Sequence, residues 1–311
     1  MSTLSEDQGN RSVTAPGGRR LEFRLTGPPG GLPVVFHHGA PGAAVPFGPL
    51  ERAAADRGLR VLTVSRPGYG ASDPLPEKTA PGTVAGAVAD TRYVLDEVGA
   101  ENFLALGWSS GGPRALACGA LLPGRCRAVA ALAGYAPPGV AGLDPVAGMD
   151  EHSAAEFTAA RQGRRALEAY LHEQVQAMTA AASAPDGDVV ELLRAMLPPV
   201  DRAVMTGDFA DYVMGAAEHS RRQGIVGWRD DDLAVDRPWG FAVERIAVPT
   251  RIWHGRDDRA VPVSHGEWLA AHVPGARAHL LEREGHLSLM ARLDRVLDDL
   301  LDAAEVDEGG M

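Results

Sequence analysis

Cysteine and aromatic residues are scarce in this chain. Its 311 residues include two cysteines, Cys118 and Cys126, and only 5% of the residues are aromatic. Two cysteines cannot build a disulfide framework, and their spacing fits no structural metal site. Both are therefore expected to be small buried side chains, and no metal is expected.

Long apolar runs and an excess of positive charge are also missing. No stretch approaches the roughly 18 apolar residues of a transmembrane helix, and the polar N-terminal region lacks the apolar centre of a signal peptide. The net charge of −11 argues against nucleic acid or an anionic membrane as a partner. We expect a cytoplasmic protein that acts on a small-molecule substrate; whether it forms a homo-oligomer stays open.

The most informative stretch is G-x-S-x-G at residues 107–111. It lies between an apolar, strand-like run over 102–107 and an alanine- and leucine-rich, helix-like run over 112–122. A strand that turns sharply into a helix strains its turn residue, and flanking glycines let the chain pass closely. This context predicts a nucleophile elbow that exposes the hydroxyl of Ser109 beside a helix N-terminus.

An activated serine needs a base, and the base needs an acid that orients it. The candidate base is His286, which follows a strand-like run over 276–282. The candidate acids are Asp257 and Asp258, which follow an apolar strand over 250–253. The order of serine, acid and histidine along the chain is the one expected after such an elbow.

Together with two further loops, these motifs resemble the α/β-hydrolase superfamily over about residues 20–304. The loops are His-His-Gly-Ala-Pro-Gly at 37–42 and Ser-Arg-Pro-Gly-Tyr-Gly-Ala-Ser-Asp at 65–73. The second loop is typical of the lid-bearing serine hydrolase branch, which includes esterases and proline-iminopeptidase-like and haloperoxidase-like enzymes. The resemblance implies a mostly parallel central sheet flanked by helices, with an inserted all-helical lid.

The resemblance also assigns roles to single residues. Members of the family usually show Gly-x-x-Asp-x-x-Val-Pro, and residues 255–262 fit that register for Asp258 rather than Asp257. The implied catalytic triad is therefore Ser109, His286 and Asp258. The implied oxyanion hole is formed by the backbone N–H groups of Ala40 and Ser110.

Further residues are weaker candidates for substrate contact. They are Trp108, His38, Trp228 and Trp239. For His38 the competing interpretation is a structural hydrogen bond within its loop, and for Trp108 it is core packing. Arg66 is expected to brace its loop against neighbouring carbonyl or carboxylate groups.

Secondary-structure patterns predict the division of the chain. The prediction comprises a disordered leader (1–19), an α/β-hydrolase core (20–136 and 247–304), a helical lid (137–246) and an acidic tail (305–311). Residues 21–25 alternate apolar and charged side chains, as an edge strand does. Within the lid, helices are predicted over 151–182, 189–196 and 208–219.

The predicted function is a carboxylesterase-like serine hydrolase that needs no cofactor. It would cleave an ester or related acyl bond of a small to medium hydrophobic substrate through an acyl-enzyme on Ser109. A prolyl aminopeptidase-like peptidase is an alternative that would use lid carboxylates such as Glu151, Glu156 or Glu218. A C–C bond hydrolase, a thioesterase, and a non-catalytic ligand-binding module on the same fold are the others.

Overall fold

A nine-stranded sheet forms the centre of the computed structural model, which describes residues 6–7, 9–76, 82–182 and 189–308. The strand order is β1-β2-β3-β5-β4-β6-β7-β8-β9. The strands are β1 (Glu6–Asp7), β2 (Asn10–Thr14), β3 (Arg20–Thr26), β4 (Pro33–His37), β5 (Arg60–Val64), β6 (Phe103–Trp108), β7 (Cys126–Leu132), β8 (Thr250–Gly255) and β9 (Arg277–Leu281). From β5 to β9 all neighbouring strands are parallel, whereas β1, β2 and β3 pair antiparallel.

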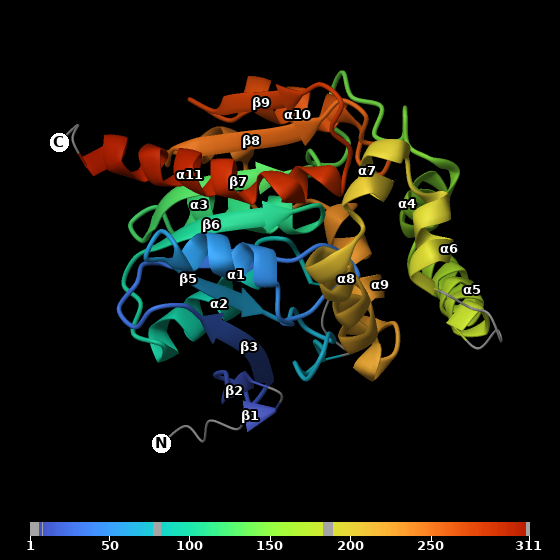
Figure 1. Cartoon of the computed structure of the whole chain (residues 1–311), viewed down its shortest axis with the longest axis horizontal. Helices are drawn as coiled ribbons and strands as arrows, with labels where there is room; N and C mark the ends of the chain where they lie inside the picture. Colours follow the sequence, from blue (N-terminus) through green and yellow to red (C-terminus); the bar gives the residue numbers. More distant parts are fainter. Residues whose placement is uncertain (1–5, 8, 77–81, 183–188, 309–311) are drawn as a thin grey trace.

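Helices cover both faces of the sheet (Figure 1). One face carries α1 (Gly48–Ala55) and α11 (Leu293–Glu308), and the other carries α2 (Gly86–Glu97), α3 (Gly111–Leu121) and α10 (Val263–His272). Successive strand residues face opposite sides of the sheet. In β6, Leu104 and Leu106 therefore pack in the apolar cluster under α1 and α11, whereas Ala105 packs in the other cluster. Burial on both faces explains why the parallel strands are continuous apolar runs.

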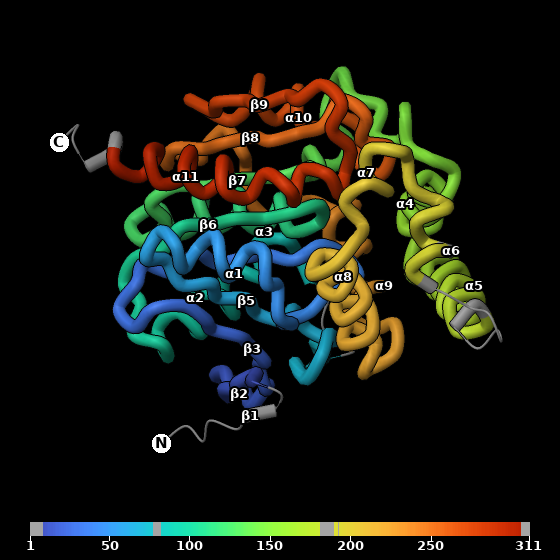
Figure 2. The backbone as a smooth tube through the Cα atoms, in the orientation of Figure 1, coloured from blue at the N-terminus to red at the C-terminus, as the bar shows by residue number. Residues whose placement is uncertain are grey.

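In the described residues between β7 and β8, the chain forms six α-helices and two short 3-10 helices, and no strand. The α-helices of this insertion are α4 (Glu151–Gln162), α5 (Arg164–Ala182), α6 (Val189–Met196), α7 (Pro199–Val204), α8 (Gly207–Ser220) and α9 (Val226–Val235). Figure 1 shows them together at the edge toward which the parallel strands point. In the tube of Figure 2 the chain leaves the sheet after β7 and returns to it at β8. The predicted parallel sheet, flanking helices and helical insertion are confirmed.

Three predictions about element boundaries are wrong. Residues 10–14, predicted within a disordered leader, form β2, whose Val13 pairs with Leu21. Both side chains are buried against the core, so β3 is an interior strand and not the predicted edge strand. Helix α11 continues to Glu308, so the first residues of the predicted acidic tail belong to that helix.

Gly163 divides the long helix predicted over 151–182. Its φ of 102° ends α4, and α5 begins at the next residue. Left-handed backbone at a helix end favours glycine, because a side chain would be strained there. In the described part of the chain, no helix is long and apolar enough to cross a membrane.

Candidate active site

Ser109 occupies a strained turn at the carboxyl end of β6. Its φ is +57°, one of the few positive values at a non-glycine residue in the described chain. A Cβ at Gly107 would collide with the backbone of Gly111, and a Cβ at Gly111 would collide with the carbonyl of His37. The local geometry of the predicted elbow is therefore present, and the two glycines are needed because the backbones pass so closely.

The loop after β4 faces this turn. Gly39, Ala40 and Ser110 line the same cavity as Ser109, and a Cβ on Gly39 would lie 3.4 Å from the Cβ of Ser109. The loop itself is held from behind by Arg66, which donates to the carbonyl oxygens of His38 (2.7 Å) and Gly39 (3.0 Å). The predicted bracing role of Arg66 is confirmed.

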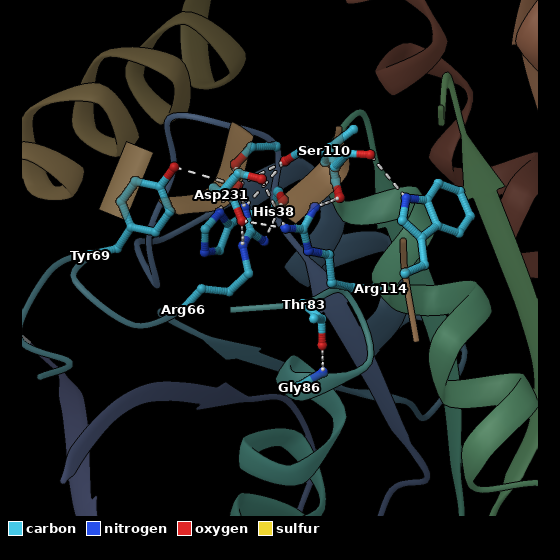
Figure 3. Close-up of polar contacts among 11 residues, drawn as sticks. His38, Arg66, Tyr69, Thr83, Gly86, Ser110, Arg114 and Asp231 are labelled. Carbon is cyan, nitrogen blue, oxygen red and sulfur yellow. Dashed lines mark hydrogen bonds and ion pairs between the residues drawn. The ribbon is translucent and has the colours of Figure 1, made fainter. Parts of the chain in front are cut away.

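A buried carboxylate from the insertion completes this brace (Figure 3). Asp231 of α9 accepts hydrogen bonds from Arg66 at 2.6 and 2.8 Å and from Arg114 of α3 at 2.8 Å. The hydroxyl of Ser110 donates to the same carboxylate at 3.1 Å. Burial alone would raise the pKa of Asp231, but Arg114 and Arg66 outweigh it and lower that pKa. Helix α9 is thereby fixed to the loops that surround the elbow.

Asp258 orients His286. Its Oδ2 lies 2.8 Å from the Nδ1 of His286, and its Oδ1 accepts the backbone N–H groups of Ala260 (2.9 Å) and Val261 (2.8 Å). The side chain of Asp258 is fully buried, whereas Asp257 is exposed. The structure thus pairs the histidine with Asp258, as the predicted register requires. The other ring nitrogen, Nε2, is the one left to act as a base.

The charges at this pair shift both pKa values. Burial alone would lower the pKa of the His286 imidazole, but the Asp258 carboxylate outweighs it, and the pKa rises above the usual 6.5. Burial alone would raise the pKa of Asp258, but His286 and His254 lower it far below its usual range. In contrast, burial and the charge of Arg66 lower the pKa of His37 to about 3 and hold that of His38 well below 6.5.

The main chain around His286 is held from two sides. The indole of Trp108 donates to the carbonyl oxygen of His286 at 3.1 Å, and the two rings lie 5.6 Å apart. Asp201 of α7 accepts the backbone N–H groups of His286 (3.1 Å), Leu287 (2.8 Å) and Ser288 (2.9 Å). Trp108 packs in the apolar cluster under α1 and α11, as one interpretation predicted, and it also lines the cavity, where substrate contact stays a prediction.

A cavity of about 400 Å³ opens over Ser109 and His286. Most of its wall comes from the helical insertion and is apolar. Apolar and aromatic lining residues include Tyr135, Phe157, Met178, Met205, Tyr212 and Trp228. Trp228 is thus placed where substrate contact was predicted. A pocket of this size and character suits a small to medium, largely apolar ligand.

Acidic side chains form a polar part of the wall. Asp150, Glu156 and Asp232 line the cavity, and Glu156 accepts a hydrogen bond of 2.7 Å from the indole of Trp228. Burial raises the pKa of Glu156, and burial together with the charge of Glu156 holds the pKa of Asp232 well above its usual value. Among the described lining residues, Arg259 is the one arginine or lysine, and His152 and His286 are the histidines. This wall is therefore more acidic than basic.

Two predicted substrate contacts are wrong. Trp239 is 2% exposed, donates to the carbonyl of Val235 and packs in the apolar core beside α2 and α3, away from the cavity. His38, the first residue of the loop after β4, is completely buried, with its Nδ1 2.7 Å from the carbonyl oxygen of Gly39. Its alternative interpretation, a structural hydrogen bond, is confirmed.

Sequence reasoning did not find Asp201 and Asp231. Each lies in a helix of the insertion and contacts residues 85 to 165 positions away along the chain. No local motif marks such an aspartate, because its partners are brought near only by the tertiary fold. Within the described residues, no group of three or more histidine, cysteine or acidic side chains could hold a metal ion.

The family model described as the alpha/beta hydrolase fold matches residues 33–292. The chain therefore belongs to the α/β-hydrolase fold family.

Two curated relatives and one solved structure show the range within that family. A 2-hydroxy-6-oxononadienedioate/2-hydroxy-6-oxononatrienedioate hydrolase of Cupriavidus pinatubonensis is 27% identical over 92% of both chains. A non-heme chloroperoxidase of Streptomyces lividans is 30% identical over 88% of this chain and 91% of its own. A thermophilic esterase of Thermogutta terrifontis shares the fold with a TM-score of 0.66 and 18% identity, over 95% of this chain and 98% of its own.

Proposed function

We propose that this chain is a serine hydrolase that cleaves carboxylic esters of small to medium, largely apolar molecules. The observation that carries the proposal is the position of Ser109. Its strained turn faces the same cavity as His286, whose ring is oriented by the buried carboxylate of Asp258.

The proposed reaction has two stages. His286 takes the proton of the Ser109 hydroxyl as its oxygen attacks the ester carbonyl, and the backbone N–H groups of Ala40 and Ser110 stabilise the oxyanion. The C–O bond to the alcohol then breaks, and His286 returns the proton to the leaving alcohol. In the second stage His286 deprotonates a water molecule that attacks the acyl carbonyl. The bond to the Ser109 oxygen then breaks, His286 returns the proton to that oxygen, and the carboxylic acid leaves. Asp258 stabilises the imidazolium in both stages.

The helical insertion is proposed to act as the lid of this site. Its helices supply most of the cavity wall, and they lie at the edge of the sheet where β6 ends. A cover of this kind excludes bulk water from the reacting atoms and selects substrates by shape. The substrate is therefore set by the insertion more than by the core.

Cleavage of a C–C bond is the second candidate, because the Cupriavidus relative is a hydrolase whose named substrates are dioates. The cavity argues against the same substrates here. A dicarboxylate needs cationic partners, and among the described lining residues Arg259 is the one arginine or lysine, whereas Asp150, Glu156 and Asp232 offer a carboxylate no favourable charge. Of the carboxylates considered for an aminopeptidase, Glu156 lies at the cavity.

Labelling with a fluorophosphonate probe, followed by intact-mass measurement, tests the proposal. One adduct is expected on the wild-type chain and on Ser264→Ala, a control at a serine of α10 away from the cavity. None is expected on Ser109→Ala, which should fold normally and lose at least ~10³-fold in kcat on an ester substrate. A well-folded wild-type chain that takes no adduct would contradict the proposal and favour the ligand-binding module.

A further inference from the structure

Asp201 has an unusual environment for an aspartate on a short helix. Its side chain is directed away from solvent, and the residue is 2% exposed. Three consecutive main-chain N–H groups, those of His286, Leu287 and Ser288, donate to it at 2.8–3.1 Å. These N–H groups lie at the start of the short helix Ser288–Arg292, where the unpaired N–H groups of a helix start would otherwise need a partner.

The approach of this carboxylate is close enough to restrict the sequence. A Cβ on Gly285 would lie 2.5 Å from both carboxylate oxygens of Asp201, so the residue before His286 must have no side chain. The carboxylate therefore fits against the backbone of the loop, and a shift of α7 would be transmitted to His286.

We propose that Asp201, which the helical insertion supplies, is a positioning residue that fixes the loop bearing His286 relative to Ser109 and Asp258. This inference rests on the proposed function for its catalytic consequence. It gives the insertion a second role besides covering the substrate, because one of its side chains maintains the geometry of the general base. The indole of Trp108 donates to the carbonyl oxygen of His286 and so holds the same loop.

The charge of Asp201 also acts on the imidazole. The charged groups around His286 are Asp258 after β8, Asp201 on α7 and Asp150 before α4, and Arg259 also lines the cavity. The three carboxylates raise the pKa of His286, with Asp258 contributing most. Removal of the charge on Asp201 should therefore lower the pH at which His286 loses its proton.

Asp201→Asn separates positioning from simple stability. An amide oxygen in place of Oδ1 keeps the bonds to Leu287 and Ser288, whereas the amide nitrogen faces the N–H of His286 and cannot accept from it. The matched control is Asp208→Asn on α8, since Asp208 is exposed and pairs with Arg52 at 2.6 Å. Asp201→Ala removes all three bonds and serves as a more severe variant.

The first measurement is the pH dependence of kcat/KM on para-nitrophenyl butyrate and of the rate of fluorophosphonate labelling. Asp201→Asn is expected to lose on the order of 10²-fold in both rates with little change in KM, because the base is displaced. Its acid limb should move to lower pH, and Asp208→Asn should match wild type. A wild-type rate and an unmoved acid limb in a folded Asp201→Asn would overturn the inference.

A second measurement does not depend on activity. The pKa of His286 is followed by NMR, with His286→Gln for assignment, together with hydrogen exchange of the backbone amides of residues 286–288. In Asp201→Asn the pKa is expected to fall and exchange to accelerate. If neither changes, the inference is wrong whether or not the chain labels with the probe. If the pKa and the exchange rate both change in Asp201→Asn but the wild-type chain takes no probe, the proposed function fails and the positioning role stands.

Discussion

Replacement of Asp231 by asparagine should destabilise the whole fold. The carboxylate lies between two guanidinium groups, and the side chains of Asp231, Arg66 and Arg114 are 4%, 7% and 2% exposed. When Asp231 loses its charge, the guanidinium groups of Arg66 and Arg114 stay buried and lose the carboxylate with which both are paired. Removal of one partner from a buried ion pair costs about 3–5 kcal/mol, because the other charge stays desolvated and unpaired.

Urea unfolding followed by circular dichroism measures this loss. The expected decrease of about 3–5 kcal/mol corresponds to a fall in Tm on the order of 10 °C. Asp208→Asn is the matched control, because its pair with Arg52 is 57% and 65% exposed and should be worth about 0–1 kcal/mol. If the two variants lost equally little, the brace between α9 and the elbow would not be energetically important, and the reasoning from burial would be wrong.

A double-mutant cycle isolates the pair itself. Arg114→Met removes one of the cations, so Asp231→Asn should cost less in that background than in wild type. The pKa of Asp231 is lowered in the folded protein, so its ionised form stabilises the fold at neutral pH. This stabilisation is lost as the pH falls below the ordinary aspartate value of about 3.9 toward the lower pKa of the folded state. Additive losses in the cycle would refute the proposed coupling.

Two further predictions concern the catalytic pair. Because the pKa of His286 is raised above 6.5 and the base must be neutral, kcat/KM should increase with pH through a midpoint above 6.5. The folding stability that His286 contributes is present below pH 6.5 and is lost as the pH rises through the raised pKa. A kcat/KM midpoint below 6.5 in an ester assay would contradict the assignment. Asp258→Asn should lower kcat on the order of 10⁴-fold, and Asp257→Asn, at an exposed position, should leave it near wild type. The reverse ranking in the same assay would mean that the wrong aspartate was assigned.

The sequence was sufficient for those parts of the site that local chemistry specifies. Gly107 is required by its contact with the backbone of Gly111, and Gly111 by its contact with the backbone of His37 at the end of β4. These contacts belong to the elbow itself, so the elbow could be predicted. The register of Asp258 could be predicted as well, because its Oδ1 accepts two N–H groups of its own loop. The strands predicted over 102–107, 250–253 and 276–282 agree with β6, β8 and β9 within two residues. Burial on both faces leaves a plain apolar signal in such strands.

Features that depend on distant partners could not be predicted. Asp201 and Asp231 look like ordinary surface aspartates on helices, and their partners follow or precede them by 85 to 165 residues. Trp239 illustrates the opposite error. Its place in the insertion suggested the cavity, yet it packs on the core. Trp239 lies in the segment between α9 and β8, and tertiary packing decides whether a side chain there meets the core or the cavity.

The antiparallel strand β2 has a consequence for the solubility of the molecule. It covers the outer side of β3, whose Leu21 and Phe23 are completely buried, and Asn10 reaches from it to the carbonyl of Ala44 at 2.6 Å. A chain shortened to begin at residue 20 would expose a row of unpaired backbone groups beside apolar side chains, which is the surface on which sheets add further strands and aggregate. By pairing with β3, β2 thus keeps that strand from pairing with a strand of another copy of the chain.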